Sequence, residues 1–203
     1  FNYSLDIARK IGNQTSQGSQ LGNLGLIYQS RGQYEQAIEH YTESIAISQE
    51  IGDQHNESIQ LGNLGDTLFK LERLGEAEEA LRKAISIGDR TFPVAGGAFR
   101  GSLALLLAKQ DQLEQSQTLL DTGELQVENY PEEHAKFLCK KGQVCHIGGD
   151  VEGARSALRQ AQEIATELEV RDDSDVGRWV ATLRGLLASY THPDSRADES
   201  EIK

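Results

Sequence analysis

The residues with the clearest potential for chemistry are two cysteines and two histidines between positions 134 and 146. Cys139, Cys145 and His146, with His134 nearby, are residue types that bind structural zinc. Such sites normally use cysteine pairs two to four residues apart, whereas these cysteines are six apart. A cysteine nucleophile would also need a base and an orienting group, and the sequence supplies neither. We therefore expect no metal, no cofactor and no catalytic residue.

Other patterns typical of enzymes are equally weak. Acidic residues such as Glu76, Glu78 and Glu79 offer carboxylate pairs, but solvated helix faces explain them more simply. No phosphate-binding Gly-x-x-x-x-Gly-Lys, dinucleotide-binding Gly-x-Gly-x-x-Gly or zinc-binding His-Glu-x-x-His occurs. The glycines at positions 148 and 149 are predicted to form a turn between two helices. The sequence does not favour an enzyme.

Composition narrows the range of partners. The net charge of −12 disfavours nucleic acid, whose phosphates require clustered lysine and arginine. No apolar run approaches the roughly 18 to 20 residues that span a bilayer, so no membrane partner is expected. Two cysteines in 203 residues indicate a reducing compartment rather than a disulfide framework, and we expect a cytoplasmic location.

An internal repeat determines the expected architecture. The pentapeptide Leu-Gly-Asn-Leu-Gly at 21–25 recurs unchanged at 61–65. Apolar residues follow it at steps of three and four, then break at Arg31-Gly32, and a second apolar series begins at Tyr34. This spacing predicts two amphipathic helices joined by a tight turn, repeated about every forty residues.

These residues resemble the tetratricopeptide repeat family. The first full unit supplies Leu21, Leu24, Gly25, Tyr28, Ala37, Tyr41 and Ser44, and the second supplies Leu61, Leu64, Gly65, Leu68, Ala77, Leu81 and Ala84. The usual unit has about 34 residues, and the longer step here is similar to the subclass found in kinesin light chains, Pins-type adaptors and bacterial signalling proteins. The resemblance covers about residues 1–165 and implies an all-α, right-handed α-solenoid of antiparallel helix pairs. In the fourth unit Lys141 replaces the expected leucine, so we expect its first helix to be irregular.

Four segments are predicted. Residues 1–17 form the second helix of a truncated repeat, 18–170 an array of about four repeats, 171–190 a C-terminal capping helix that includes Trp179, and 191–203 a disordered acidic tail. The chain lacks Met and begins inside a helix, so we expect a piece of a longer protein. Phe1, Leu5 and Ala8 would then leave an apolar end through which the chain could self-associate.

The resemblance also implies where a ligand would bind. In this family the first helix of each unit lines a concave groove, and its contact positions carry over here to Asn23, Leu26, Asn63, Asp66, Lys70, Ser102, Leu105, Lys109, Lys140 and Gln143. An asparagine amide can pair with both the N–H and the C=O groups of an extended peptide. The alternative is that Asn23 and Asn63 stabilise contacts between helices.

The third unit suggests a more specific hypothesis about the ligand. Residues 102–108 are apolar nearly all round, which is typical of a helix buried on more than one side. Leu105 is expected to face the groove and to form an apolar pocket flanked by Lys70 and Lys109, unless these lysines are merely solvated. Such a pocket would select a ligand with a hydrophobic anchor and an acidic group.

The function expected from the sequence is a protein–protein interaction scaffold that binds a peptide or partner protein in its concave groove. The alternative is a regulatory or sensor segment of a larger signalling enzyme or transcription regulator. The residues flanking this chain in its parent protein would separate the two.

Overall fold

The computed structural model describes residues 2–189, and within this range every regular element is an α-helix. The ten helices are α1 (Asn2–Lys10), α2 (Gln14–Ser30), α3 (Tyr34–Ile51), α4 (Gln54–Lys70), α5 (Leu74–Thr91), α6 (Pro93–Lys109), α7 (Leu113–Val127), α8 (Pro131–Ile147), α9 (Val151–Glu167) and α10 (Asp175–Ala188). The predicted tail at 191–203 lies outside the described residues.

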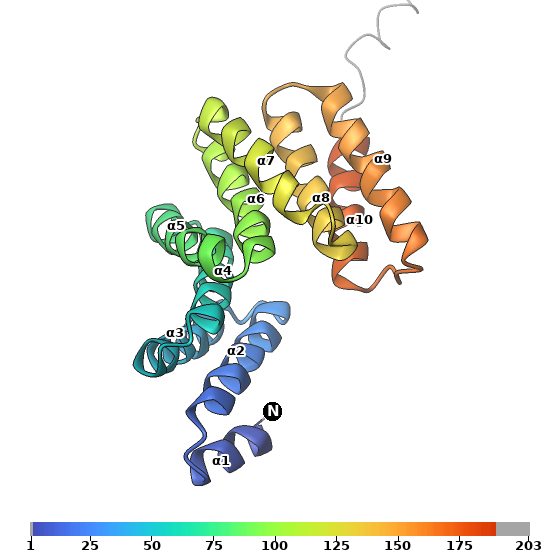
Figure 1. Cartoon of the computed structure of the whole chain (residues 1–203). Helices are drawn as coiled ribbons and strands as arrows, with labels where there is room; N and C mark the ends of the chain where they lie inside the picture. The colour runs from blue at the N-terminus through green and yellow to red at the C-terminus, as the bar shows by residue number, and fades with distance from the viewer. Residues whose placement is uncertain (1, 190–203) are drawn as a thin grey trace, which may run out of the picture.

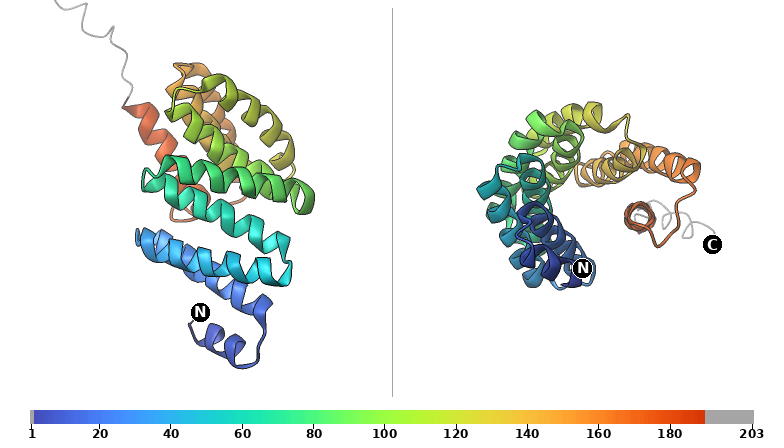
Figure 2. Two further views of the ribbon diagram at one scale, coloured as in Figure 1. Left: turned by 90° about the vertical axis from the view of Figure 1, so that its left-hand side faces the viewer. Right: turned by 60° about the horizontal axis from the view of Figure 1, so that its bottom comes forward.

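The helices form an arc of antiparallel pairs: α2 with α3, α4 with α5, α6 with α7, and α8 with α9 (Figure 1). The first helices of successive pairs contact one another, whereas the second helices of the described pairs do not. This difference bends the array toward its first helices, which lie on the inner side of the arc (Figure 2). The expected all-α solenoid is confirmed, and α1 stands as a single helix packed against α2. The expectation that Leu5 and Ala8 form an exposed apolar end is wrong, because both are buried, and Phe1 lies outside the described residues.

The two glycines of the repeated pentapeptide explain why it recurs. A Cβ atom on Gly25 would collide with the ring of Tyr41, and one on Gly65 would lie 2.7 Å from Leu81 Cγ, so each admits a side chain from the second helix of its own pair. The other two glycines face the first helix of the following pair. A Cβ atom on Gly22 would collide with Gln60 of α4, and one on Gly62 with the ring of Phe99 of α6. The second glycine of each pentapeptide therefore allows close contact within its pair, and the first allows close contact with the next pair.

Buried serines join the two helices of a pair by hydrogen bonds. Ser44 Oγ donates to the Gly18 carbonyl at 2.7 Å, and Ser58 Oγ donates to the Ala84 carbonyl at 2.8 Å. Ser116 makes the equivalent bond to Ala104 in the third pair, also at 2.8 Å. A hydroxyl that is nearly inaccessible to water needs such a partner, so these bonds fix the position of each helix along its neighbour.

The turns and helix starts also follow the sequence. Gly12, Gly32 and Gly52 occupy the left-handed region with φ of 68°, 73° and 72°, which a glycine adopts without steric cost. Pro93 and Pro131 stand in the first turn of α6 and α8, where a missing N–H costs little.

The third and fourth pairs pack more closely than the sequence indicated. The ring of Phe137 on α8 lies where Cβ atoms on Gly101 of α6 and Gly123 of α7 would be, so α8 approaches both helices closely. The expected irregularity of α8 is wrong, because the helix is continuous from Pro131 to Ile147. Lys141 is accommodated by an ion pair with Glu124 of α7 at 2.6 Å.

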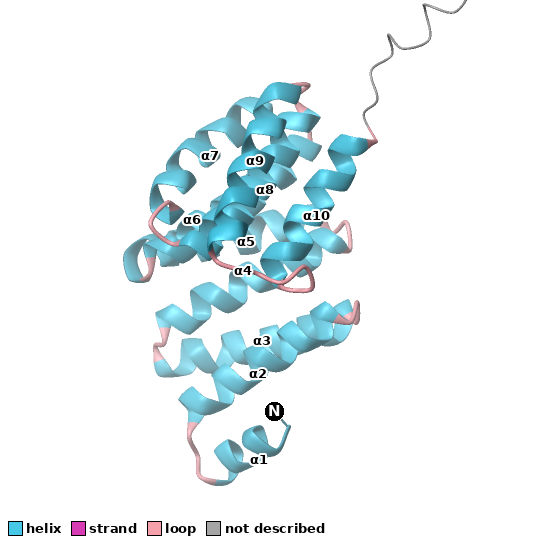
Figure 3. Cartoon of the chain, turned by 90° about the vertical axis from the view of Figure 1, so that its right-hand side faces the viewer, coloured by secondary structure: helices cyan, strands magenta, loops and turns pink. Residues whose placement is uncertain are grey.

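Helix α10 takes the place of the first helix of a fifth pair. It contacts α8 and α9, and Val176, Val180 and Leu183 are buried in a cluster with Ala135 and Leu138 of α8. Figure 3 shows it lying along the edge of α8, after the loop that follows α9. The helix thus covers the apolar end of the last pair, as a capping helix should.

The role assigned to the pentapeptide glycines can be tested by alanine substitution. We expect Gly62→Ala to lower the free energy of unfolding by about 1–3 kcal/mol, because the added methyl group must displace the Phe99 ring. Gly75→Ala is the control, since it is exposed in α5 with no atom within 4 Å of an added Cβ, and it should be stabilising by up to about 1 kcal/mol. Urea unfolding followed by circular dichroism measures both. Equal effects would refute the close-approach argument.

A polar junction of α5, α6 and α7 makes stability depend on pH. Arg100 donates two hydrogen bonds to Asp89, which lower the pKa of that carboxyl group. The folded pKa lies below the unfolded value of about 3.9, so the stabilisation is complete above that value and is lost as the pH falls through the folded pKa. We expect Asp89→Asn to cost about 1 kcal/mol at pH 7 and to match the parent in strong acid. A difference that stays constant with pH in urea unfolding would contradict this.

Candidate peptide-binding site

The structure places all ten predicted groove residues on first helices, but not all on the surface. Those at least partly exposed are Asn23 and Leu26 on α2, Asn63, Asp66 and Lys70 on α4, Lys109 on α6 and Gln143 on α8. Ser102 and Leu105 of α6 and Lys140 of α8 are buried. The groove is therefore more open over the first two pairs than over the last two.

The two asparagines differ in their surroundings. Asn63 Nδ2 donates to Gln60 Oε1 at 3.4 Å, and Gln60 in turn donates to Asn56 Oδ1 at 3.0 Å. The amide of Asn63 thus belongs in part to a chain of side chains within α4. Asn23 is half-buried and has no side-chain hydrogen bond among the described residues, so both its donor and its acceptor are available.

The expectation that Leu105 faces the groove is wrong. Its side chain is 5% exposed and lies in a core cluster with Val94, Phe137 and Val144. The physical reason is the close approach of α8 to α6, which covers a face that is open in the earlier pairs. An apolar pocket centred on Leu105 is therefore absent from the described structure.

Lys140 is a buried cation without an acidic partner. It is 8% exposed, and its ammonium group donates to Ser102 Oγ at 2.7 Å and to the Ala98 carbonyl at 3.3 Å. No carboxylate of the described residues lies within 4.0 Å of it, in contrast to Lys83, Lys136 and Lys141, which each pair with a glutamate. A buried charge normally has a counter-charge, so this position is unusual.

The sequence predicted that Trp179 lies on the capping helix but did not indicate which side chains surround its ring. The ammonium group of Lys140 lies 5.4 Å from the centroid of its ring, and that of Lys70 lies 5.8 Å from it. Lys109 lies similarly over the ring of Phe69, at 4.8 Å. These distances are within the range of cation–π interactions. Helix periodicity places Trp179 on α10 but carries no information on which distant helix the ring meets.

Lys70, Lys109 and Lys140 share one further property. None has a carboxylate of the described residues within 4.0 Å, and each ammonium group instead faces an aromatic ring. In a chain with a net charge of −12, three such cations on the first helices form a basic region. We call Lys70, Lys109, Lys140 and Trp179 the lysine–tryptophan cluster.

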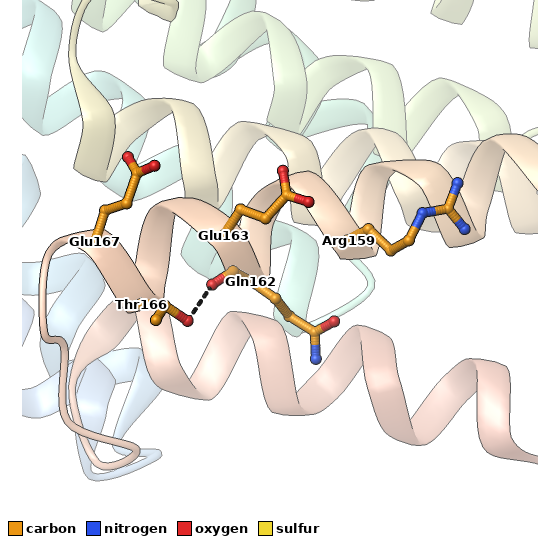
Figure 4. A pocket seen from close by; sticks show the side chains of 5 residues that line it. All are labelled: Arg159, Gln162, Glu163, Thr166 and Glu167. Carbon is orange, nitrogen blue, oxygen red and sulfur yellow. Dashed lines mark hydrogen bonds between the residues drawn. The ribbon is translucent and has the colours of Figure 1, made fainter.

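Two cavities of the described structure lie away from this cluster. A shallow depression of about 430 Å³ runs along α9 alone, lined by Arg159, Gln162, Glu163, Thr166 and Glu167 (Figure 4). A smaller one of about 210 Å³ lies among α7, α8 and α9 and includes Cys145. Neither shows an acid–base pair with shifted pKa values of the kind that marks an enzyme site.

The cysteines and histidines do not form a reactive centre within residues 2–189. Burial raises the pKa of Cys139 to about 12, and burial followed by the charge of Asp150 raises that of Cys145, so both remain thiols near neutral pH. The described part of the chain contains no group of three or more His, Cys, Asp or Glu side chains arranged to hold a metal ion. It also contains no helix long and apolar enough to cross a membrane.

Comparison with known proteins agrees with this geometry. Residues 18–89 match the tetratricopeptide repeat family model. Residues 18–89 carry tetratricopeptide repeats. No curated protein sequence matches it.

Solved structures extend the repeat fold over most of the chain. The crystal structure of BtubC (BKLC) from P. vanneervenii is similar with a TM-score of 0.62 and 17% identity, over 80% of this chain and 68% of that protein. A Podospora anserina protein assigned as a kinesin light chain, with nearly identical TPR-like repeats, gives a TM-score of 0.57 and 17% identity, over 82% and 84%. At this identity the likeness shows the tetratricopeptide fold alone.

The unusual state of Lys140 can be tested by two substitutions. Ser102→Ala removes one acceptor from a buried ammonium group and should cost about 1–3 kcal/mol of unfolding free energy. Lys140→Met removes the charge itself while keeping the aliphatic chain, and should be close to neutral or stabilising. Urea unfolding compares the two. A larger loss for Lys140→Met than for Ser102→Ala would show that the ammonium group is well compensated in the folded protein.

Proposed function

We propose that this chain is a protein–protein interaction module that binds an extended, acidic segment of a partner on its concave face. The fold is generally a protein-binding scaffold, and the lysine–tryptophan cluster is the observation that supports the acidic character of the ligand. Its lysines have no carboxylate partner among the described residues, and a ligand carboxylate would supply one.

The two ends of the inner surface would play different parts in binding. Near α2, Asn23 offers an unpaired amide, and Leu26 is 44% exposed, so main-chain pairing and an apolar contact are available together. Toward α10 the surface becomes basic. A bound segment would therefore be held by its backbone over the first pairs and by its acidic side chains over the later ones. The two cysteines are free thiols, which supports the reducing, cytoplasmic setting expected from the sequence.

The binding face can be identified with affinity capture. Purified protein immobilised as bait should retain partners from a lysate of its source, and Asn23→Ala combined with Asn63→Ala should lose them. The matched control is Gln36→Ala with Gln115→Ala, since both glutamines are exposed on second helices. Partners that survive the asparagine substitutions but not the glutamine substitutions would place binding on the convex face.

The charge of the ligand is tested separately. Lys70→Glu with Lys109→Glu should weaken binding of a captured partner by at least about tenfold, because two attractions become repulsions of about 1 kcal/mol or more each. Lys83→Glu with Arg159→Glu changes the net charge equally, on exposed positions of α5 and α9, and should have little effect. Isothermal titration measures both. Unchanged affinity in the first variant would exclude the electrostatic part of the proposal.

A further inference from the structure

Helix α10 brings its own side chain to the basic part of the concave face. Its backbone contacts only α8 and α9 among the described helices, yet the ring of Trp179 reaches Lys70 on α4. Lys140 of α8 faces the same ring. The view along the arc shows α10 on its inner side, between the last pair and the N-terminal helices (Figure 2). Trp179 therefore connects α10 to the second pair through side chains alone.

We propose that the ring of Trp179 occupies the place of a ligand carboxylate beside Lys70 and Lys140, so that α10 acts as an autoinhibitory gate over the concave face. The inference rests on the proposed function, because it assumes that an acidic segment binds these lysines. The face of an indole ring carries the negative part of its quadrupole and attracts a cation as a weak substitute for an anion. A ligand carboxylate interacts more strongly with the same ammonium groups and displaces the ring.

The packing of α10 permits such a displacement. Its apolar attachment to α8 and α9 runs through Val176, Val180 and Leu183, which are 4%, 5% and 0% exposed, and the partly buried Trp179, Leu186 and Leu187 pack against the same cluster. Trp179 is only partly buried, and Lys70 is exposed. The contact between Trp179 and Lys70 can therefore break while the three buried side chains keep α10 in place. Opening the gate requires a movement of one ring and a slight widening of the arc, with the repeats intact.

The charges around the ring are consistent with a gate that responds to anions. Lys70 and Lys140 are the cations recorded over Trp179, and neither has an acidic partner among residues 2–189. On its own helix, Asp175 lies one turn earlier and is directed to other groups, with Arg178 at 3.5 Å and Lys136 at 3.8 Å. In the closed state the two lysines thus share the ring, and Lys140 also donates hydrogen bonds to Ser102 and Ala98.

The closed contact can be measured without any ligand, because Trp179 is the only tryptophan in the chain. We expect Lys70→Gln to shift its fluorescence emission to the red and to increase quenching by acrylamide, since the ring becomes more accessible to water. Lys83→Gln is the control, on the exposed face of α5 and paired with Glu79. Both lysines are exposed, so neither substitution disturbs the core. Identical spectra for Lys70→Gln and the parent would overturn the gate.

The inhibitory effect is measured with a glutamate decapeptide as the probe. Trp179→Leu keeps an apolar side chain but removes the aromatic face, and should bind the probe about 3- to 10-fold more tightly than the parent, because the cation–π contacts with exposed Lys70 and buried Lys140 no longer compete. Circular dichroism confirms that the variant is folded. Equal or weaker binding would overturn the gate, since a tryptophan that contacts the ligand would cause a loss.

The fluorescence and binding experiments together distinguish a failure of the gate from a failure of the proposed function. If the decapeptide binds neither protein, the proposed acidic ligand is wrong, and the gate is judged by the emission of Lys70→Gln alone. If the decapeptide binds both proteins equally while Lys70→Gln leaves the emission unchanged, the proposed function survives and the gate is rejected.

Discussion

The structure depends on how closely neighbouring helices can approach at a few positions without a side chain. Gly25 admits the ring of Tyr41 from its own pair, and Gly62 admits the ring of Phe99 from the next. In each contact an aromatic ring occupies the space that the methyl group of an alanine would take. The ring buries far more apolar surface than that methyl group would. Because the first helices of successive pairs contact one another and the second helices do not, the same constraint that holds the pairs together also bends them into an arc.

The curvature in turn determines where charged groups meet. The tight approach of α8 to α6 around Phe137 buries Ser102 and Lys140, and the arc then brings α10 toward α4. A basic region thereby forms inside a chain that is strongly acidic overall. Its position follows from the packing of the third and fourth pairs rather than from any cluster of basic residues in the sequence, since its three lysines are about 30 to 40 positions apart.

The sequence predicted those features that depend on local chemistry. The pentapeptide and the glycines at the turns were sufficient to place the pairs, because each acts within one or two turns of helix. The exposure of Leu105 was predicted wrongly because it depends on how closely α8 approaches α6. The sequence of α6 carries no information on that approach. The contact of Trp179 with Lys70 was missed for the same reason. It joins residues from distant helices through the shape of the whole arc.

The most direct test of this account is site-specific photo-crosslinking. A benzoylphenylalanine residue would replace Leu26 on the inner surface or Leu125 on the second helix α7, two leucines that are 44% and 70% exposed. After irradiation in lysate of the source, the account predicts covalent partner adducts from position 26 and none from position 125, although the second is more accessible. Adducts from position 125 alone would contradict the claim that the concave face is the binding surface.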